Sequence, residues 1–220
     1  MIRLLFKKRE KVSPLINFGL PVISSFFSLL LGFAILVLFG IDFLAAIKMG
    51  LIHPLSSSYG WIHMILKMIT LLFCTIGLII AFRSGIWNIG AEGQILMGAA
   101  MATWVALFLL PNSSSIIVIP LMYLFGFLGG ALWAFIPGIL KAKFDVNEVL
   151  TTIMMNYIAF GIVSFLIVGP WRGKYVYGYE TTDVIPESAR LPVISRSIPI
   201  PYISLALSLS LTVITYYLLF

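Results

Sequence analysis

Residues 85–94 read Gly-Ile-Trp-Asn-Ile-Gly-Ala-Glu-Gly-Gln, a polar segment with three glycines between two long apolar runs. Its carboxylate, Glu92, lies just before an uncharged run that extends over 95–110. A carboxylate so close to hydrocarbon is costly, so it marks a functional-site hypothesis. The glycines disfavour an ordinary continuous helix, and irregular backbone at membrane depth is tolerated only where protein or a watery cavity surrounds it. The segment therefore predicts a helix broken around 84–94, where a solute binds or passes.

The composition indicates that lipid is the main solvent of this chain. Of its 220 residues, 61% are hydrophobic and 10% are charged, and the mean hydropathy is +1.10. Apolar residues make up only about half of an ordinary soluble domain. Five of the fourteen basic residues precede the first apolar run: Arg3, Lys7, Lys8, Arg9 and Lys11. Such a cluster is typical of a cytoplasmic anchor beside anionic lipid, so we expect the lipid bilayer, and no nucleic acid, as its partner.

Six apolar runs are candidates for membrane-crossing helices, which need about 20 residues each. They cover 18–41, 61–82, 95–110, 116–140, 149–168 and 201–220. The first run is too long for the apolar core of a cleaved signal peptide, so we expect it to remain as a span. The third is short, which fits a helix that begins within the broken segment. We predict an all-α, polytopic transmembrane helix bundle.

The basic residues set the expected orientation. With the N-terminus in the cytoplasm, Arg83, Lys141 and Lys143 also lie on the cytoplasmic side. The expected organisation is a cytoplasmic basic N-terminus over 1–17, followed by a transmembrane region over 18–220.

The segment 169–200 then becomes an extracytoplasmic loop. Its aromatic residues fit either an interfacial belt or a docking surface for an external protein: Trp171, Tyr175, Tyr177 and Tyr179.

Small residues recur every four positions in the fourth apolar run, at Gly126, Gly130, Ala134 and Gly138. On a helix these residues share one face, and their size allows a neighbouring helix to approach closely. We interpret this stripe as a helix-packing face.

Two interpretations of the broken segment stay open. Asn88 and Glu92 are four residues apart and share a face if the local turn is helical, and Gln94 adds a second amide. These groups suit direct contact with a neutral polar solute on a translocation path. Equally, they can brace the broken helix ends by pairing with orphan backbone groups.

A second polar constellation lies in the turn and helix start over 141–156. Asn147 is a good helix N-cap, and Glu148 complements the helix dipole in the first turn. Asn156 lies deeper in the apolar run, where it is suited to bond to another helix.

We expect neither a metal site nor a catalytic group. His53 and His63 lack acidic or cysteine neighbours at ligand spacing, and no phosphate-binding loop is present. A membrane-embedded enzyme that uses Glu92 as general acid or base is the alternative, but such an enzyme needs a second catalytic group within reach.

Three segments together resemble a known family: FRSGIWNIGAEGQILMGA at 82–99, LKAKFDVNEVLTTIMMNYIA at 140–159 and IPESARLP at 185–192. They are similar to the inner-membrane permeases of bacterial nucleoside and simple-sugar ABC importers, in the branched-chain amino acid and ribose-type permease superfamily. The resemblance implies a multi-pass permease of the bacterial plasma membrane that transports nucleosides, or alternatively simple sugars.

The resemblance also implies partners and cofactors. A second permease subunit, a cytoplasmic ATP-binding subunit and an extracytoplasmic solute-binding lipoprotein are expected. ATP and Mg²⁺ are expected on the ATP-binding subunit and no cofactor on this chain, so the chain is not expected to be an enzyme.

Members of this family are longer, with about ten spans. The chain therefore resembles a truncated permease, with the first half plus one span. The loop that docks on the ATPase in the family lies beyond that point, so we expect no coupling to ATP hydrolysis by this polypeptide alone.

Overall fold

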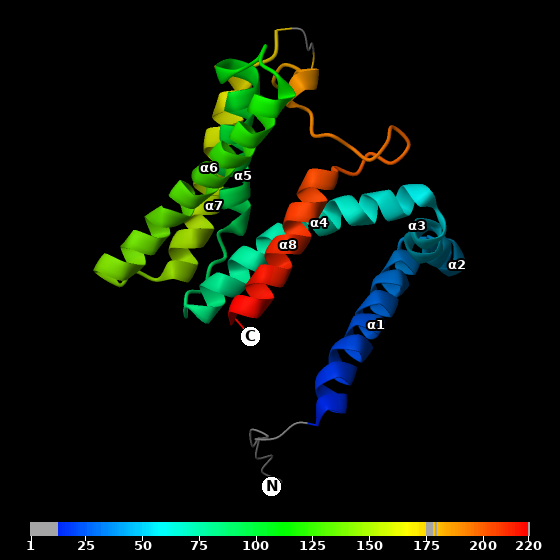
Figure 1. The fold of residues 1–220 in the computed structure, drawn as a ribbon. Coiled ribbons are helices and arrows are strands. Elements are labelled where there is room, and N and C mark those ends of the chain that lie inside the picture. Colours follow the sequence, from blue (N-terminus) through cyan, green and yellow to red (C-terminus); the bar gives the residue numbers. More distant parts are fainter. Residues whose placement is uncertain (1–12, 175–177, 179, 220) are drawn as a thin grey trace. The chain divides into compact units, whose positions relative to one another are not determined.

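The computed structural model describes residues 13–174, 178 and 180–219, and within them it is helical with two isolated β-bridges. The helices are α1 (Pro14–Leu38), α2 (Phe43–Ile47), η1 (Lys48–Ile52), α3 (His53–Ser56), α4 (Ser58–Arg83), α5 (Ala91–Trp104), η2 (Val105–Leu109), α6 (Ser115–Phe144), α7 (Glu148–Val168), η3 (Glu187–Ala189) and α8 (Tyr202–Leu219) (Figure 1). Within these residues, six helices are long and apolar enough to cross a membrane. This confirms the predicted fold class, and the six helices coincide with the six predicted runs.

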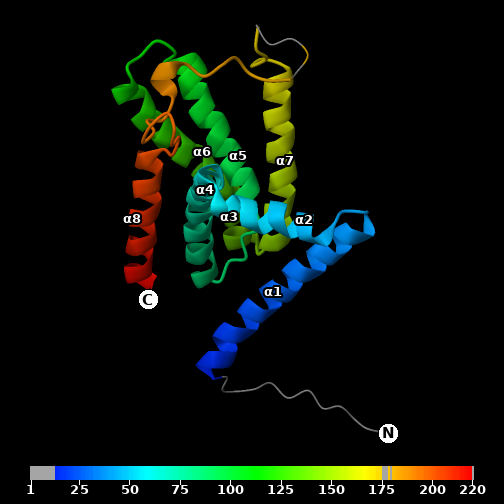
Figure 2. The same ribbon diagram turned by 90° about the vertical axis from the view of Figure 1, so that its right-hand side faces the viewer.

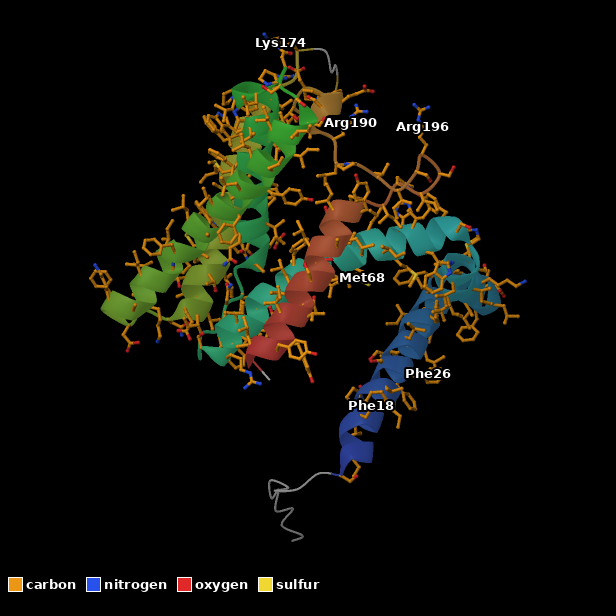
Figure 3. All side chains as sticks on the ribbon, viewed as in Figure 1. Phe18, Phe26, Met68, Lys174, Arg190 and Arg196 are labelled. Atoms are coloured by element: carbon orange, nitrogen blue, oxygen red, sulfur yellow. The ribbon has the colours of Figure 1, made fainter. Side chains whose placement is uncertain are left out.

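The chain forms two compact units, residues 1–64 and 65–220. In the first unit, Ser13 caps α1 by accepting a hydrogen bond from the Ile16 amide. Phe18 and Phe26 project from α1, and their side chains are exposed (Figure 3), as expected for a helix surrounded by lipid. The basic N-terminus predicted over 1–17 falls largely outside the described residues.

A further helix, not predicted from the sequence, lies between the first two spans in the chain. Residues Phe43–Ser56 form a short apolar helix, built from α2, η1 and α3. Asp42 starts it, because its carboxylate accepts a hydrogen bond from the Ala45 amide at 2.8 Å.

Helices α5, α6 and α7 pack against one another in the second unit (Figure 2). Glycines bring the backbones of α5 and α6 into contact. A Cβ on Gly98 would lie 2.8 Å from the carbonyl oxygen of Gly126, and a Cβ on Gly129 would lie 2.8 Å from that of Met97. Since a side chain at either position needs the helices to move apart, the close approach depends on glycine.

The predicted small-residue stripe is only partly the packing face. Gly126 and Gly130 do face α5, which confirms the prediction for them. The prediction is wrong for Gly138, since a Cβ there would have nothing within 4 Å. Gly129 lies outside the stripe and yet makes a closer contact, because α6 turns a slightly different face toward α5.

The loop 169–200 is anchored at the end of the second unit where α6 begins. Ala189 of η3 is buried in a small core with Ala106 and Val118. The Trp171 ring packs on Phe108 with ring centroids 5.4 Å apart. Lys174 and Arg196 project away from the helices (Figure 3). Tyr175, Tyr177 and Tyr179 of the predicted aromatic surface lie outside the described residues.

Candidate functional site

The irregular segment between α4 and α5 begins with a glycine-dependent helix end. Gly85 adopts a φ of 77°, in the left-handed region that favours glycine. The Gly85 amide donates to the Phe82 carbonyl and the Ile86 amide to the Ala81 carbonyl, which is the hydrogen-bond pattern of a Schellman motif. The chain then runs without helix to Ala91. The break is therefore 84–90 and not 84–94 as predicted, and Glu92, Gly93 and Gln94 belong to the first turn of α5.

Asn88 does not share a helix face with Glu92. It lies in the non-helical segment, so the spacing of four residues carries no helical geometry. Its side chain instead pairs with Gln94: Nδ2 donates to Gln94 Oε1 at 3.4 Å, and Oδ1 accepts from Gln94 Nε2 at 3.2 Å. Asn88 Oδ1 also accepts from the Gly90 amide at 2.9 Å.

The start of α5 is capped by a side chain from another helix. Its own N-cap residue is Gly90, which has no side chain to accept a hydrogen bond. Asn156 of α7 supplies this acceptor, because its Oδ1 accepts from the Gly93 amide at 2.8 Å. Its Nδ2 donates to the Ile89 carbonyl at 3.0 Å. Asn156 therefore bonds to another helix, as its sequence position predicts, and it replaces the missing N-cap of α5.

Thr152 makes a second link between α7 and the irregular segment. Its Oγ1 accepts from the Ile89 amide at 3.2 Å and donates to the Glu148 carbonyl at 2.7 Å, one turn earlier in α7. The close approach needs glycine on the other side, since a Cβ on Gly90 would lie 3.0 Å from Thr152 Cβ. Thr152 was not among the site residues predicted from the sequence. Its position could have indicated it, because it lies four residues before Asn156 on the same helix face.

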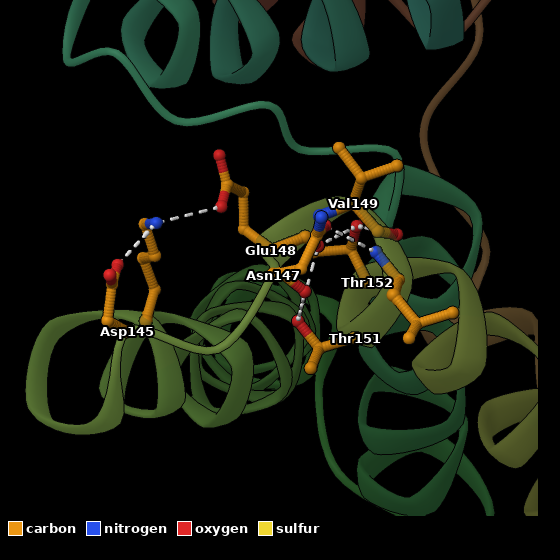
Figure 4. Close-up of polar contacts among 8 residues, drawn as sticks. Asp145, Asn147, Glu148, Val149, Thr151 and Thr152 are labelled. Carbon is orange, nitrogen blue, oxygen red and sulfur yellow. Dashed lines mark hydrogen bonds and ion pairs between the residues drawn. The ribbon is translucent and has the colours of Figure 1, made fainter.

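The turn between α6 and α7 carries a local charge cluster (Figure 4). Asn147 caps α7, as predicted, by accepting from the amides of Val149 and Leu150. The Lys141 ammonium lies 2.7 Å from Asp145 Oδ1 and 3.3 Å from Glu148 Oε2. Asp145 ends α6 in the left-handed conformation, with a φ of 50°. The hydrogen bond from Lys141, aided by its charge, lowers the pKa of the Asp145 carboxyl.

The two polar constellations of the sequence come together at one end of the second unit. Ile89 and Gly93 lie at the contact, where they bond to side chains of α7. Ile89 of the segment 84–90 thus bonds to the second and third turns of α7 through Thr152 and Asn156. The arrangement is a hydrogen-bonded joint between irregular backbone and a helix.

Glu92 differs from its polar neighbours. Its side chain is exposed, and it forms neither a hydrogen bond nor an ion pair with any part of the chain that the structure describes. Its place in the first turn of α5 suits a carboxylate, because the amide end of a helix dipole is positive. Glu92 also belongs to no metal site, since the described residues contain no group of three or more metal-ligating acids, histidines or cysteines. Glu92 is therefore an available acceptor beside a braced segment.

A family model described as the permease component of branched-chain amino acid transport systems matches residues 61–219. This match covers more than two thirds of the chain and includes the whole hydrogen-bonded joint. The chain belongs to this permease family.

Three of the curated relatives that match this chain are named as ABC transporter permease proteins. A glucose ABC transporter permease protein of Haloferax volcanii is 32% identical over 189 residues, which cover 86% of this chain and 47% of the relative. A nucleoside ABC transporter permease protein of Lactococcus lactis is 34% identical over 163 residues, covering 74% and 44% of the two chains. A guanosine ABC transporter permease protein of Bacillus subtilis is 48% identical over 87 residues, covering 40% and 24%.

The permease chain spans less than half the length of these curated relatives. No solved structure matches it. With six helices of membrane-crossing length among the described residues and this family membership, it is a multi-pass membrane protein.

Proposed function

We propose that this chain forms part of the membrane permease of an ATP-driven importer for nucleosides or related small polar solutes. The observation that carries the proposal is the family match over residues 61–219 in a chain with six membrane-length helices. Two of the relatives named above are nucleoside or guanosine permease proteins, which supports the solute class. A simple sugar is the second candidate, because the relative that matches 86% of this chain is a glucose permease protein.

The proposed importer has separate subunits for energy and for solute capture. ATP and Mg²⁺ bind to a cytoplasmic ATP-binding subunit, a second permease completes the path, and an extracytoplasmic lipoprotein delivers the solute. The N-terminus lies in the cytoplasm, together with Arg83, Lys141 and Lys143, in keeping with the preference of basic residues for that side. The joint between the segment 84–90 and α7 then lies at the cytoplasmic end of the path.

Within this joint we assign different roles to the polar side chains. The side-chain amides of Asn88 and Gln94 bond to each other, and the Asn156 amide bonds to two backbone groups, which supports a bracing role. Asn147 and Glu148 hold the start of α7. Glu92 has no such partner among the residues that the structure describes, which supports contact with the solute or with water in the path.

A substitution in the complete importer tests the role of Glu92. Glu92→Gln keeps the size of the side chain and removes its charge. We expect uptake of radiolabelled guanosine into proteoliposomes to fall at least about tenfold, with normal assembly on native gels. The matched control is Asp42→Asn, which also removes one carboxylate but keeps a side chain that caps α2. Loss of assembly would assign Glu92 to bracing instead, and normal uptake with normal assembly would refute both roles.

Competition by unlabelled solutes tests the solute class. Excess adenosine or guanosine should abolish uptake, while glucose and ribose should leave it unchanged. Uptake of radiolabelled glucose without uptake of radiolabelled guanosine would establish the sugar alternative.

A further inference from the structure

The helix Phe43–Ser56 is too short to cross a membrane. Its 14 residues span about 21 Å, against a hydrocarbon core of about 30 Å. The helices before and after it, α1 and α4, are both long and apolar enough to cross. The segment between two such spans begins and ends on the same side of the bilayer, so Phe43–Ser56 stays at one membrane face.

The packing of Phe43–Ser56 on α1 indicates how deep this short helix lies in the bilayer. Phe43 meets Phe33 edge to face, with ring centroids 6.5 Å apart. Gly50 leaves room for the same ring, since a Cβ there would lie 3.0 Å from Phe33 Cε1. Phe33 precedes the end of α1 at Leu38 by five residues, or about 7 Å along the helix. The short helix therefore lies against the wall of α1, slightly inside its end.

Aromatic residues beside the helix are those preferred at a membrane–water boundary. The Trp61 indole donates a hydrogen bond to the Leu55 carbonyl at 2.8 Å, which ties the helix to the start of α4. Tyr59 and Trp61 are exposed. Both residue types are enriched at the level of the lipid headgroups, where one end of the side chain is apolar and the other meets water.

The exposed side of the helix combines large apolar side chains with basic ones. Leu44, Met49 and Ile52 are between 53% and 78% exposed, which is unfavourable in water and expected against acyl chains. Lys48 of η1 and His53 of α3 are also exposed. The acidic side chain Asp42 is engaged in capping α2. Apolar and basic groups together fit the boundary between acyl chains and anionic phosphates.

We propose that Phe43–Ser56 is an interfacial helix that lies in the plane of the membrane and binds phospholipid at the headgroup boundary. The inference rests on the crossing of α1 and α4 and holds whichever solute the permease carries.

Site-directed spin labelling of the full 220-residue chain tests this proposal. Cys74 is the single cysteine, so a Cys74→Ser background allows one new cysteine at a time, at Leu44, Met49, Ile52 or Leu55. The protein is reconstituted in bilayers of phosphatidylcholine and phosphatidylglycerol. Depth is measured from collisions of the label with oxygen and with a water-soluble nickel chelate. Phe27→Cys, exposed near the middle of α1, is the matched deep control. Circular dichroism and gel filtration verify that each variant is folded.

We expect the four labels to lie at similar depths near the headgroups, each several ångströms shallower than the label at residue 27. A crossing helix would instead separate the labels at residues 44 and 55 by about 16 Å. That separation would overturn the proposal. Labels that collide only with the nickel chelate would place the helix in water and would also overturn the proposal. Labels that collide with neither probe would show that protein covers the helix, with the same consequence.

Discussion

Asn156 caps the start of α5, which the residue at the N-cap position of α5 cannot do. The N-cap residue Gly90 offers no side chain, and the first amides of a helix have no partner within it. A side chain from α7 fills this role, with one acceptor for the Gly93 amide and one donor for the Ile89 carbonyl.

Replacing Asn156 by leucine should destabilise the protein. The change leaves two backbone groups of the joint without partners, which typically costs about 1–3 kcal/mol in the free energy of unfolding. The measurement is equilibrium unfolding in mixed detergent micelles. Tyr157→Phe is the matched control, because Tyr157 is 71% exposed on the same helix and should change by less than about 0.5 kcal/mol. Equal effects of the two substitutions would contradict the capping role.

Asp145 should contribute stability that depends on pH. Its pKa is lowered in the folded state, chiefly by the hydrogen bond from Lys141, so the ionised form is the stabilising one. This contribution is present above the unfolded-state pKa and is lost as the pH falls through the folded-state pKa. The wild type should therefore exceed Asp145→Asn in stability at pH 7, and the difference should close below about pH 4. Asparagine also tolerates left-handed backbone, so the comparison isolates the charge.

Unfolding measured from pH 7 to pH 2 provides the test. Repeating it with Lys141→Met in both proteins should remove the pH-dependent difference. A difference that stays constant over the whole range, or that survives without Lys141, would rule out this ion pair as its source.

At the level of helices, glycine decides how closely α5 and α6 pack. Gly129→Ala brings a Cβ to 2.8 Å from the backbone oxygen of Met97, so the helices must separate. We expect a loss of about 1–3 kcal/mol in unfolding free energy. Gly138→Ala in the same helix has no contact within 4 Å and should be neutral, or stabilising by up to about 1 kcal/mol. Similar losses for both variants would contradict the packing explanation, and a gain for both would show that helix propensity, and not packing, governs α6.

The helix boundaries also show how far sequence reasoning reaches. Hydropathy located all six long helices, because a run of about 20 apolar residues has few alternatives in lipid. It missed Phe43–Ser56, because 14 residues are too short for a span criterion. It extended the break to residue 94, because glycine content alone does not reveal that Gly93 can begin a helix when another helix supplies the cap.

At the scale of the whole chain, the loop 169–200 is held by a buried anchor. Ala189 is 3% exposed and packs with Ala106 and Val118. Ala189→Glu places a carboxylate in this apolar core, which should release the loop. Hydrogen–deuterium exchange of loop amides around Ala189 should accelerate at least about tenfold. Val184→Glu adds the same charge where the side chain is 73% exposed and should leave exchange unchanged. Protection that persists in Ala189→Glu would show that the loop is held elsewhere.

The sequence indicated which polar residues belong to the candidate site, but it did not indicate which of them form hydrogen bonds with each other. Asn88, Asn147 and Asn156 were conspicuous because amides are rare beside apolar runs. Asn147 makes only local bonds, so its capping role followed from the sequence. Asn88 would share a face with Glu92 only if its turn were helical; the turn is not helical, and Asn88 pairs with Gln94 instead.

Lipid solvation determined the class of fold and the positions of the spans. Within hydrocarbon, each apolar run must form its backbone hydrogen bonds internally, and a helix does so. That constraint acts within a single run and can be read from composition. The cap of α5 needed the tertiary structure, because Gly93 and Asn156 are 63 residues apart and meet only where α7 lies beside α5. Such a contact depends on the glycines that admit close backbone approach and on the register of two helices, and neither is encoded in local hydropathy.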